Sequence, residues 1–300
     1  MSTTGAAPAT IRPMREADVP AVERLTDEGF YELDVRTTPP DRPVPARRSQ
    51  GRALRWQRRM HHILAHDPGG CWVAETQDGV VGVAAAMKRD LTWILATFVV
   101  SPALQGQGLG SRLLESALDH GRGCLRGMLS ASPDPRAARR YRLAGFSLHP
   151  TMDLSGVVDR SCLPVVERVR EGSSSDIDLM DSVDRQVRDS AHGVDHELLT
   201  TLYRLVVVDR STGSGYAYVE SDGSPYLVAA TNRRSATDLL WECLASSDPA
   251  ASCTVGHVTP ANEWAVDVGL AARLDLRSQG YLGLRHMKPP MPYLPSGHFL

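Results

Sequence analysis

Three glycines lie close together in the segment Gln105–Gly110, whose sequence is QGQGLG. This segment separates an apolar run, Leu91–Val100, from a stretch beginning at Leu109 that has the apolar spacing of a helix. Glycine lets the backbone adopt a positive φ and lets a ligand approach the main chain closely. A loop that leads from a strand into a helix exposes unpaired N–H groups, and the helix dipole adds to their attraction for anions. The segment is therefore predicted to bind phosphates, and a diphosphate would suit it.

Two common diphosphate motifs do not match this segment. The dinucleotide fingerprint G-x-G-x-x-G fits at Gly106 and Gly108, but its third position is Ser111. A P-loop requires Gly-Lys-Ser/Thr, and no lysine lies nearby. A nicotinamide- or flavin-dependent oxidoreductase is therefore kept only as a secondary alternative.

The spacing that does fit is Gln105-x-x-Gly108-x-Gly110, preceded by Val100 and Pro102. It resembles the acetyl-CoA motif of the GNAT superfamily of N-acetyltransferases. The resemblance implies that acetyl-CoA binds along the end of the apolar strand, the loop and the start of the helix. The residues that it assigns to the cofactor here are Phe98, Val99, Val100, Gln105, Gly106, Gln107, Gly108, Leu109, Gly110 and Ser111.

A second match lies at DPRAARRYRLAGF, residues 134–146. It resembles the GNAT pattern N-x-x-A-x-x-x-Y-x-x-x-G-F, and it adds Asp134, Ala137 and Tyr141 to the implied cofactor site. Asp134 departs from the usual asparagine, because a carboxylate accepts a hydrogen bond but cannot donate one. The resemblance covers most of residues 10–155.

The resemblance also implies a mechanism in which an amine attacks the thioester directly. A backbone N–H at Val100, or at its neighbour Phe98, would hold the developing oxyanion, and such donors supply about 3–4 kcal/mol. Tyr141 would give a proton to the leaving thiolate, because its reference pKa of about 10 keeps it protonated at neutral pH. The base stays open, since Leu91–Val100 contains no acid. Its candidates are a water held by Thr97 or Ser130, or the side chains of Glu32, Asp34 and His61.

The predicted elements follow the same order in both halves: strand, helix, hairpin, helix, strand, helix, strand. Asp-Gly pairs at 78–79 and 222–223 mark the two hairpins. We predict an α/β (α+β) fold with two GNAT-like domains, each a mixed, mostly antiparallel sheet with flanking helices. Residues 1–156 form the acetyl-CoA-binding GNAT domain. Residues 163–300 form a degenerate GNAT-like domain with an extended C-terminal tail.

The second half has ATNRRS at 230–235, where its own phosphate loop should be, and this segment contains no glycine. It is therefore predicted not to bind CoA in the same way, but to shape or cover the acceptor site. Ser235 and Asp238 have the spacing of a capping box and predict the start of a helix at Ser235.

Composition limits the partners and the location. The net charge of −2 gives no electrostatic reason for nucleic-acid binding. No stretch approaches 18 apolar residues, and the start MSTTGAAPATIRPM lacks the basic and apolar regions of a signal peptide. The 5 cysteines are scattered, which favours a reducing compartment. We expect a cytoplasmic monomer or homodimer that neither binds nucleic acid nor contacts a membrane, and whose partner is a small-molecule or peptide amine.

Two histidine pairs, His62 with His66 and His192 with His196, have a spacing that can bind a metal. Neither has an evident third ligand nearby in the sequence, and Gly193 weakens the second helix, so no metal is predicted. The predicted activity is transfer of an acetyl group from acetyl-CoA to a primary amine. The alternative is a non-catalytic acyl-CoA sensor or scaffold, which the missing strand carboxylate and Asp134 favour.

Overall fold

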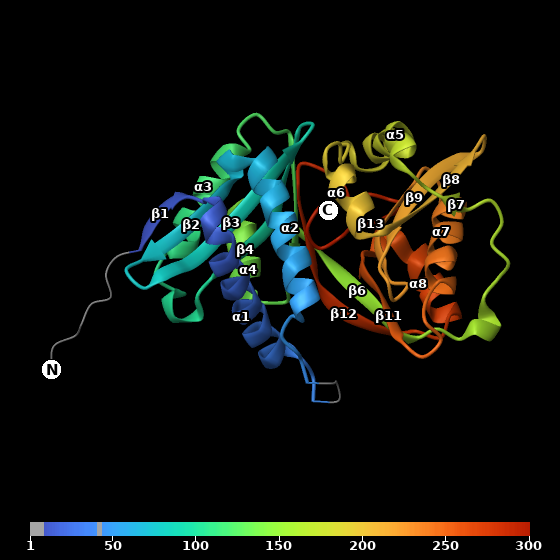
Figure 1. Ribbon diagram of the computed structural model, residues 1–300, viewed down its shortest axis with the longest axis horizontal. Helices are drawn as coiled ribbons and strands as arrows, with labels where there is room; N and C mark the ends of the chain where they lie inside the picture. Colours follow the sequence, from blue (N-terminus) through green and yellow to red (C-terminus); the bar gives the residue numbers. More distant parts are fainter. Residues whose placement is uncertain (1–8, 41–43) are drawn as a thin grey trace. The chain divides into compact units, whose positions relative to one another are not determined.

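The computed structural model describes residues 9–40 and 44–300 and groups them into two compact units (Figure 1). The first unit takes Lys88 and the residues before it, together with Trp93–Cys124, and the second takes Arg89–Thr92 and Leu125–Leu300. None of the helices in the described ranges is both long and apolar enough to cross a membrane. The prediction that the chain has no signal peptide rests mostly on residues before residue 9, which lie outside the described ranges.

The first unit combines an antiparallel sheet with three helices. Its strands follow the order β1-β2-β3-β4, with β1 antiparallel to β2 and β2 antiparallel to β3. Thr76 pairs with Gly79 at the predicted Asp-Gly hairpin, where Gly79 has a φ of +119°. The elements are β1 (Thr10–Pro13), α1 (Val19–Thr37), α2 (Gln50–His66), β2 (Cys71–Thr76), β3 (Gly79–Arg89), β4 (Thr92–Val100) and α3 (Leu109–His120).

Helix α3 forms because its apolar residues recur on one face and a core covers that face. Leu109, Leu113, Leu114 and Ala117 are all buried, and burial of each leucine contributes about 1.5–3 kcal/mol. The indole Nε1 of Trp93 on β4 donates to the carbonyl of Ala117 at 2.9 Å. This bond ties the end of α3 to β4, and so fixes both sides of the intervening glycine loop.

The second unit contains two sheets and five helices. One sheet has the order β5-β12-β6-β11, and the other has the order β13-β10-β9-β8-β7. The strands are β5 (Arg126–Ala131), β6 (Ser147–Val157), β7 (Arg170–Glu171), β8 (Arg204–Arg210), β9 (Gly213–Val219), β10 (Pro225–Ala230), β11 (Ser252–Val258), β12 (Asp275–Arg285) and β13 (Tyr293–Leu294). The helices are α4 (Pro135–Leu143), α5 (Ile177–Arg188), α6 (Asp195–Leu202), α7 (Arg233–Ala245) and α8 (Glu263–Ala271).

In the first of these sheets, strands from the two halves of the sequence alternate. Strand β12 pairs antiparallel with both β5 and β6, and β6 pairs antiparallel with both β12 and β11. The last long strand of each half, β6 or β12, thus has both edges occupied by strands of the other half. Separation of the halves would expose unpaired strand edges. The domain ranges 1–156 and 163–300 stay a prediction, and the boundary between them falls inside this second unit.

The two faces of the second sheet carry different side chains. Ala217 and Val219 of β9 belong to an apolar core that includes Leu239 and Leu240 of α7. Because side chains alternate along a strand, Tyr216 and Tyr218 point to the opposite face, and there both contact His196 of α6.

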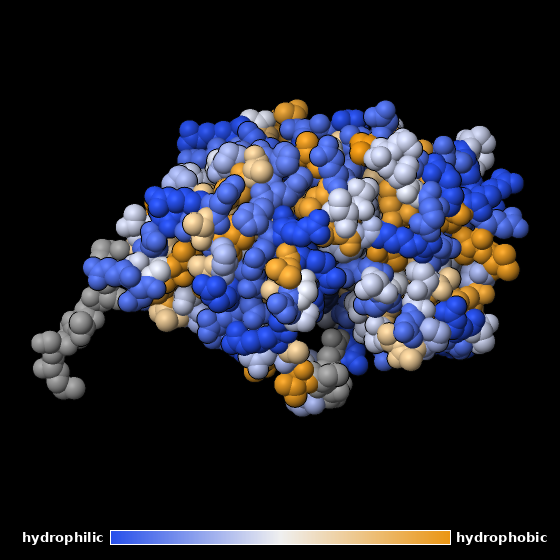
Figure 2. All heavy atoms as spheres, viewed as in Figure 1, coloured by the Kyte–Doolittle hydropathy of each residue, from blue (hydrophilic) through white to orange (hydrophobic). Residues whose placement is uncertain are grey.

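Helix α7 begins earlier than the sequence predicted. Asn232 is its N-cap, and the Asn232 side chain accepts a hydrogen bond from the Ser235 N–H at 2.9 Å. The predicted capping box at Ser235 is therefore wrong, because Ser235 already lies inside the first turn. The predicted fold class is confirmed: mostly antiparallel sheets with flanking helices. Hydrophilic side chains dominate the face shown in Figure 2, with apolar ones scattered among them.

Candidate active site

The glycine loop joins β4 to α3 in the first unit, as the sequence predicted. Gly106 has a φ of +83° and Gly108 a φ of +80°, which is the left-handed region that favours glycine. A Cβ built at either position would meet nothing within 4 Å. The backbone conformation, and not the lack of space, therefore requires these two glycines. Gly110 differs from them because it lies inside the first turn of α3.

The start of α3 leaves main-chain donors available. Its N-cap is Gly108, which has no side chain to cap the first turn, and the turn carries no acidic residue. The first N–H groups of a helix have no intrahelical partner and form the positive end of its dipole. Gly106, Gln107 and Gly108 are exposed, so an anion can reach this part of the loop.

Side-chain and main-chain hydrogen bonds hold the loop on the end of β4. The Gln105 Nε2 donates to the carbonyl of Val100 at 2.9 Å, and the Ser101 N–H donates to the carbonyl of Val81 at 2.8 Å. The Gln105 side chain therefore links the loop to the last residue of β4. Its polar and flexible side chain suits this role. The ten predicted residues from Phe98 to Ser111 form one continuous strand, loop and helix start.

The other predicted residues lie on or next to α4, in the second unit. Asp134 is the N-cap of α4, and its carboxylate accepts from the Arg136 N–H at 2.8 Å. Aspartate and asparagine cap helices about equally well, so the departure from the family pattern is compatible with the local structure. Ala137 is half-buried on the same helix. The assignment of Asp134 and Ala137 to the cofactor stays a prediction.

Tyr141 is 5% exposed, and burial raises the pKa of its phenol above the usual value. The phenol is therefore protonated at neutral pH, as a proton donor must be. The chain reverses after α4 at Gly145, which has a φ of +87°, and the Phe146 N–H donates to the carbonyl of Tyr141 at 3.0 Å. The Gly-Phe pair of the motif thus forms the C-terminal cap of the helix that carries Tyr141.

The corresponding junction in the second half, between β10 and α7, is engaged by the protein itself. Strand β13 pairs with β10, and the Ala230 N–H donates to the carbonyl of Pro292 at 3.3 Å. The Thr231 N–H donates to the carbonyl of Ser214 at 2.8 Å, and Asn232 caps α7. The N–H groups of Ala230, Thr231 and Ser235 at this junction therefore already have protein partners.

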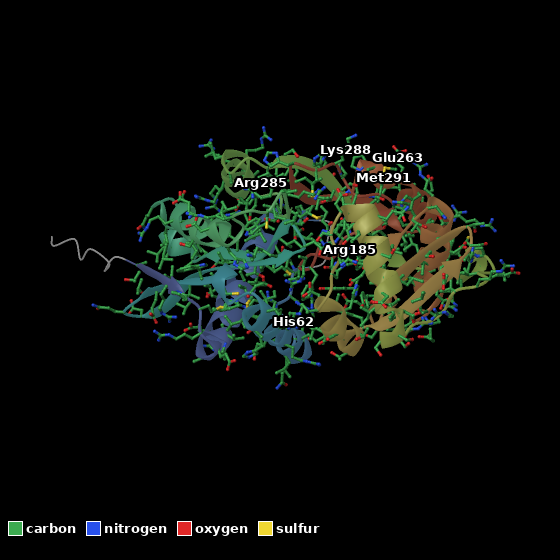
Figure 3. The ribbon with its side chains drawn as sticks, turned by 90° about the horizontal axis from the view of Figure 1, so that it is seen from above. His62, Arg185, Glu263, Arg285, Lys288 and Met291 are labelled. Atoms are coloured by element: carbon green, nitrogen blue, oxygen red, sulfur yellow. The ribbon has the colours of Figure 1, made fainter. Side chains whose placement is uncertain are left out.

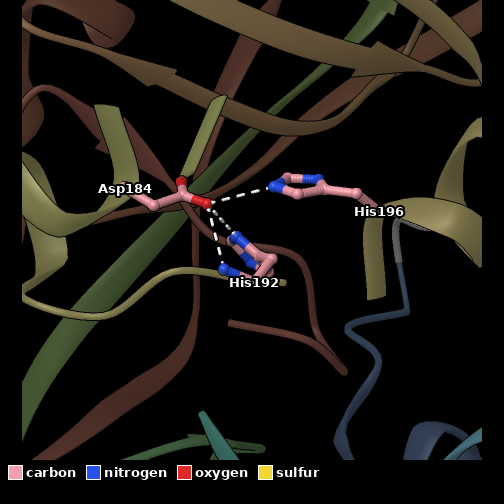
Figure 4. Close-up of side chains that lie close together, drawn as sticks. All are labelled: Asp184, His192 and His196. Atoms are coloured by element: carbon pink, nitrogen blue, oxygen red, sulfur yellow. Dashed lines mark hydrogen bonds and ion pairs between the residues drawn. The ribbon is translucent and has the colours of Figure 1, made fainter. Parts of the chain in front are cut away.

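The structure corrects one part of the metal prediction. Asp184 provides the third ligand-type group that the sequence analysis did not find near His192 and His196 (Figure 4). His192 lies in the loop before α6 and not on the helix, so helical spacing gave no indication of this cluster. A search for Asp together with His over the range 184–196, without a requirement for helical spacing, would have found it.

A family model matches part of the chain. Residues 28–146 match the model of the acetyltransferase (GNAT) family. This range includes the glycine loop, Asp134 and Tyr141. No curated protein sequence matches the chain significantly.

The whole chain also resembles solved structures. A putative acetyltransferase from Pyrococcus horikoshii has a TM-score of 0.73 at 15% identity, covering 100% of this chain and 96% of its own. A GCN5-related N-acetyltransferase from Kribbella flavida has a TM-score of 0.59 at 17% identity, covering 94% and 72%. One from Sphaerobacter thermophilus has a TM-score of 0.58 at 16% identity, covering 96% and 98%. At such identities the similarity establishes the GNAT fold and leaves the substrate open.

Proposed function

We propose that this protein is an N-acetyltransferase that transfers the acetyl group of acetyl-CoA to a primary amine. The observation that carries the proposal is the junction between β4 and α3, with left-handed Gly106 and Gly108 and an uncapped helix start inside the range that matches the GNAT family model. Each hydrogen bond from these amides to a diphosphate would contribute about 1.5–3 kcal/mol. The dipole of α3 would add about 0.3–1 kcal/mol.

The proposed reaction is a direct attack on the thioester. The amine nitrogen forms a bond to the carbonyl carbon, and the bond from that carbon to sulfur breaks. A main-chain N–H of Val100 or Phe98 holds the oxyanion, and Tyr141 gives its proton to the CoA thiolate. The amine nitrogen loses its proton to a base. Burial of Tyr141 supports its role as the proton donor, because the raised pKa keeps the proton on the phenol until a thiolate forms.

Among the candidate bases, Ser130 has the contact that suits the role best. Its Oγ lies 3.4 Å from Nδ1 of His257, and burial lowers the pKa of His257 to about 4. The imidazole is therefore neutral at pH 7, and its Nδ1 can accept a hydrogen bond from the Ser130 hydroxyl. Thr97 is buried, whereas Glu32, Asp34 and His61 are exposed. The choice between these candidates stays a prediction.

The second half is proposed to shape the acceptor site without binding CoA itself. The support for this is the pairing of β13 with β10, which occupies the strand edge along which a coenzyme would lie. The cytoplasmic location, the monomeric or homodimeric state and the small-molecule or peptide nature of the amine remain predictions.

The test is release of free thiol from acetyl-CoA in the presence of a panel of amines. Wild-type protein should release thiol with at least one amine, and Tyr141→Phe should slow the release by about 10²–10⁴-fold with unchanged acetyl-CoA affinity. Binding of acetyl-CoA without thiol release for any amine would favour the non-catalytic sensor. Thermal stabilisation by NAD(P) and not by acetyl-CoA would favour the oxidoreductase, because a ligand at 100 times its Kd adds about 2.7 kcal/mol.

A further inference from the structure

A buried cluster of imidazole and carboxylate groups lies in the second unit. It includes none of the residues of the proposed transfer site. Asp184 comes from α5, His192 from the following loop and His196 from α6 (Figure 4). All three are 0% exposed. Potential ligand atoms of the three lie within 4.8 Å of one another. We call these three residues the His-Asp cluster.

The Nε2 atom of His196 faces two carboxylates. It lies 3.2 Å from Oδ1 of Asp181 and 3.4 Å from Oδ2 of Asp184. The same atom is buried and has no partner that satisfies hydrogen-bond geometry. In a tetrahedral zinc site, with ligands about 2.0–2.1 Å from the metal, neighbouring ligand atoms are about 3.3 Å apart. Both observed distances match that spacing.

His192 provides the second imidazole. Its Nδ1 lies 2.6 Å from Oδ2 of Asp184, which is a hydrogen-bond distance. Coordination by both atoms would lengthen this contact to about 3.3 Å. The other ring nitrogen, Nε2, is buried and has no hydrogen-bond partner.

Asp184 of the cluster and the neighbouring Asp181 form no arginine or lysine ion pair among the described residues. Arg188 donates instead to the carbonyls of Ser190, Ala191 and Phe299. Asp184 is fully buried and Asp181 is partly buried, and a buried carboxylate without an arginine or lysine ion pair is costly. A divalent cation would offset that cost.

Neighbouring side chains hold the ligand atoms in place, as outer groups do around metal sites. The Tyr216 hydroxyl donates to Oδ1 of Asp184 at 2.6 Å, and the Tyr218 hydroxyl lies 2.9 Å from Nδ1 of His196. The Gly193 N–H donates to Oδ1 of Asp181 at 2.9 Å. Nε2 of His196 is thus left to face the two carboxylates while its Nδ1 is engaged by Tyr218.

We propose that the His-Asp cluster, together with Asp181, binds one divalent first-row transition metal ion, for which zinc is the probe. Imidazole and carboxylate ligands suit such ions. The site would be structural, because its three central residues are fully buried and leave no open position for a substrate. It would tie α5 and α6 to the tyrosine face of β9. This inference does not depend on the acetyltransferase proposal.

The exposed histidine pair on α2 gives a matched control. His62 and His66 also lie four residues apart, with ring centroids 4.3 Å apart, but His66 is exposed on the helix surface (Figure 3 labels His62). If histidine spacing alone captured metal, His66→Gln would reduce binding. If the buried cluster is the site, only changes in the cluster would do so.

The experiment measures metal in the full chain after chelation and reconstitution. Wild type should take up about one equivalent of Zn²⁺, melt at a higher temperature with zinc, and give the visible bands of four-coordinate Co²⁺ when cobalt replaces zinc. His196→Gln and Asp184→Asn should weaken zinc binding by at least about tenfold, and His66→Gln should not. Asp184→Asn keeps the size of the side chain, and circular dichroism checks its fold.

The proposal is overturned if metal-free wild type takes up no zinc, or if His196→Gln binds zinc as tightly as wild type. It is also overturned if His66→Gln alone abolishes uptake. Should both cluster variants fail to fold, the cobalt spectrum of wild type decides. Octahedral, weakly absorbing Co²⁺ indicates surface binding and refutes the buried site.

Discussion

Replacement of Gly108 by alanine should destabilise the first unit and weaken acetyl-CoA binding. Gly108 has φ +80° and ψ −10°, and an L-residue in the left-handed region costs about 1–2 kcal/mol. A Cβ at this position would meet nothing within 4 Å, so the whole cost arises in the backbone. If the free loop relaxes to avoid this cost, binding must restore the strained conformation. Affinity would then fall about 5- to 30-fold, since 1.4 kcal/mol corresponds to tenfold.

Gly51 on α2 is the matched control. A Cβ there would also meet nothing within 4 Å, but Gly51 lies in a helix and is absent from the residues with positive φ. Alanine at such a position stabilises a helix, by up to about 0.5–1 kcal/mol. The two substitutions add the same atom to equally open surroundings and should change stability in opposite directions.

The assay is urea unfolding with linear extrapolation, together with calorimetric titration of acetyl-CoA. We expect a lower unfolding midpoint or a weaker affinity for Gly108→Ala, and wild-type affinity for Gly51→Ala. If Gly108→Ala retains both the stability and the affinity of wild type, the loop does not need its left-handed conformation. Loss of affinity in Gly51→Ala to the same extent would show that the effect is not specific to the loop.

Two further predictions concern stability. Asp18 accepts hydrogen bonds from Arg12 at 2.7 and 2.9 Å, and this partner lowers the pKa of the Asp18 carboxyl below its usual value. The stability that Asp18 contributes is therefore present above a pH of about 4 and is lost as the pH falls further. Thermal melts from pH 6 to 2.5 should show a smaller acid loss for Asp18→Asn than for wild type, and equal losses would contradict the assignment. Asn232→Ala should cost about 1 kcal/mol because it removes the N-cap of α7, whereas Ser235→Ala should cost less. The reverse order in chemical unfolding would restore Ser235 as the cap.

Local physics made the glycine loop predictable from the sequence. A continuous apolar run predicts a buried strand, an apolar repeat every three to four residues predicts a helix, and glycines between them indicate an unusual backbone. These features depend on neighbours in the chain, so Gly106 and Gly108 were identified without tertiary information. The Asp-Gly hairpin at 78–79 was predictable for the same reason. Helix boundaries were less certain, because Asn232 and Ser235 are both good capping residues and only the backbone distinguishes them.

Contacts between distant residues were decided by the tertiary structure. The insertion of β12 between β5 and β6 joins residues about 120–160 positions apart, and no local pattern encodes such a pairing. The His-Asp cluster is a similar case: Asp184 meets His196 because α5 and α6 pack on the tyrosine face of β9. The sequence alone determined where the loop adopts left-handed backbone, at Gly106 and Gly108, since backbone conformation is a local property. Only the fold determined which buried side chains meet, since burial and proximity depend on the whole chain.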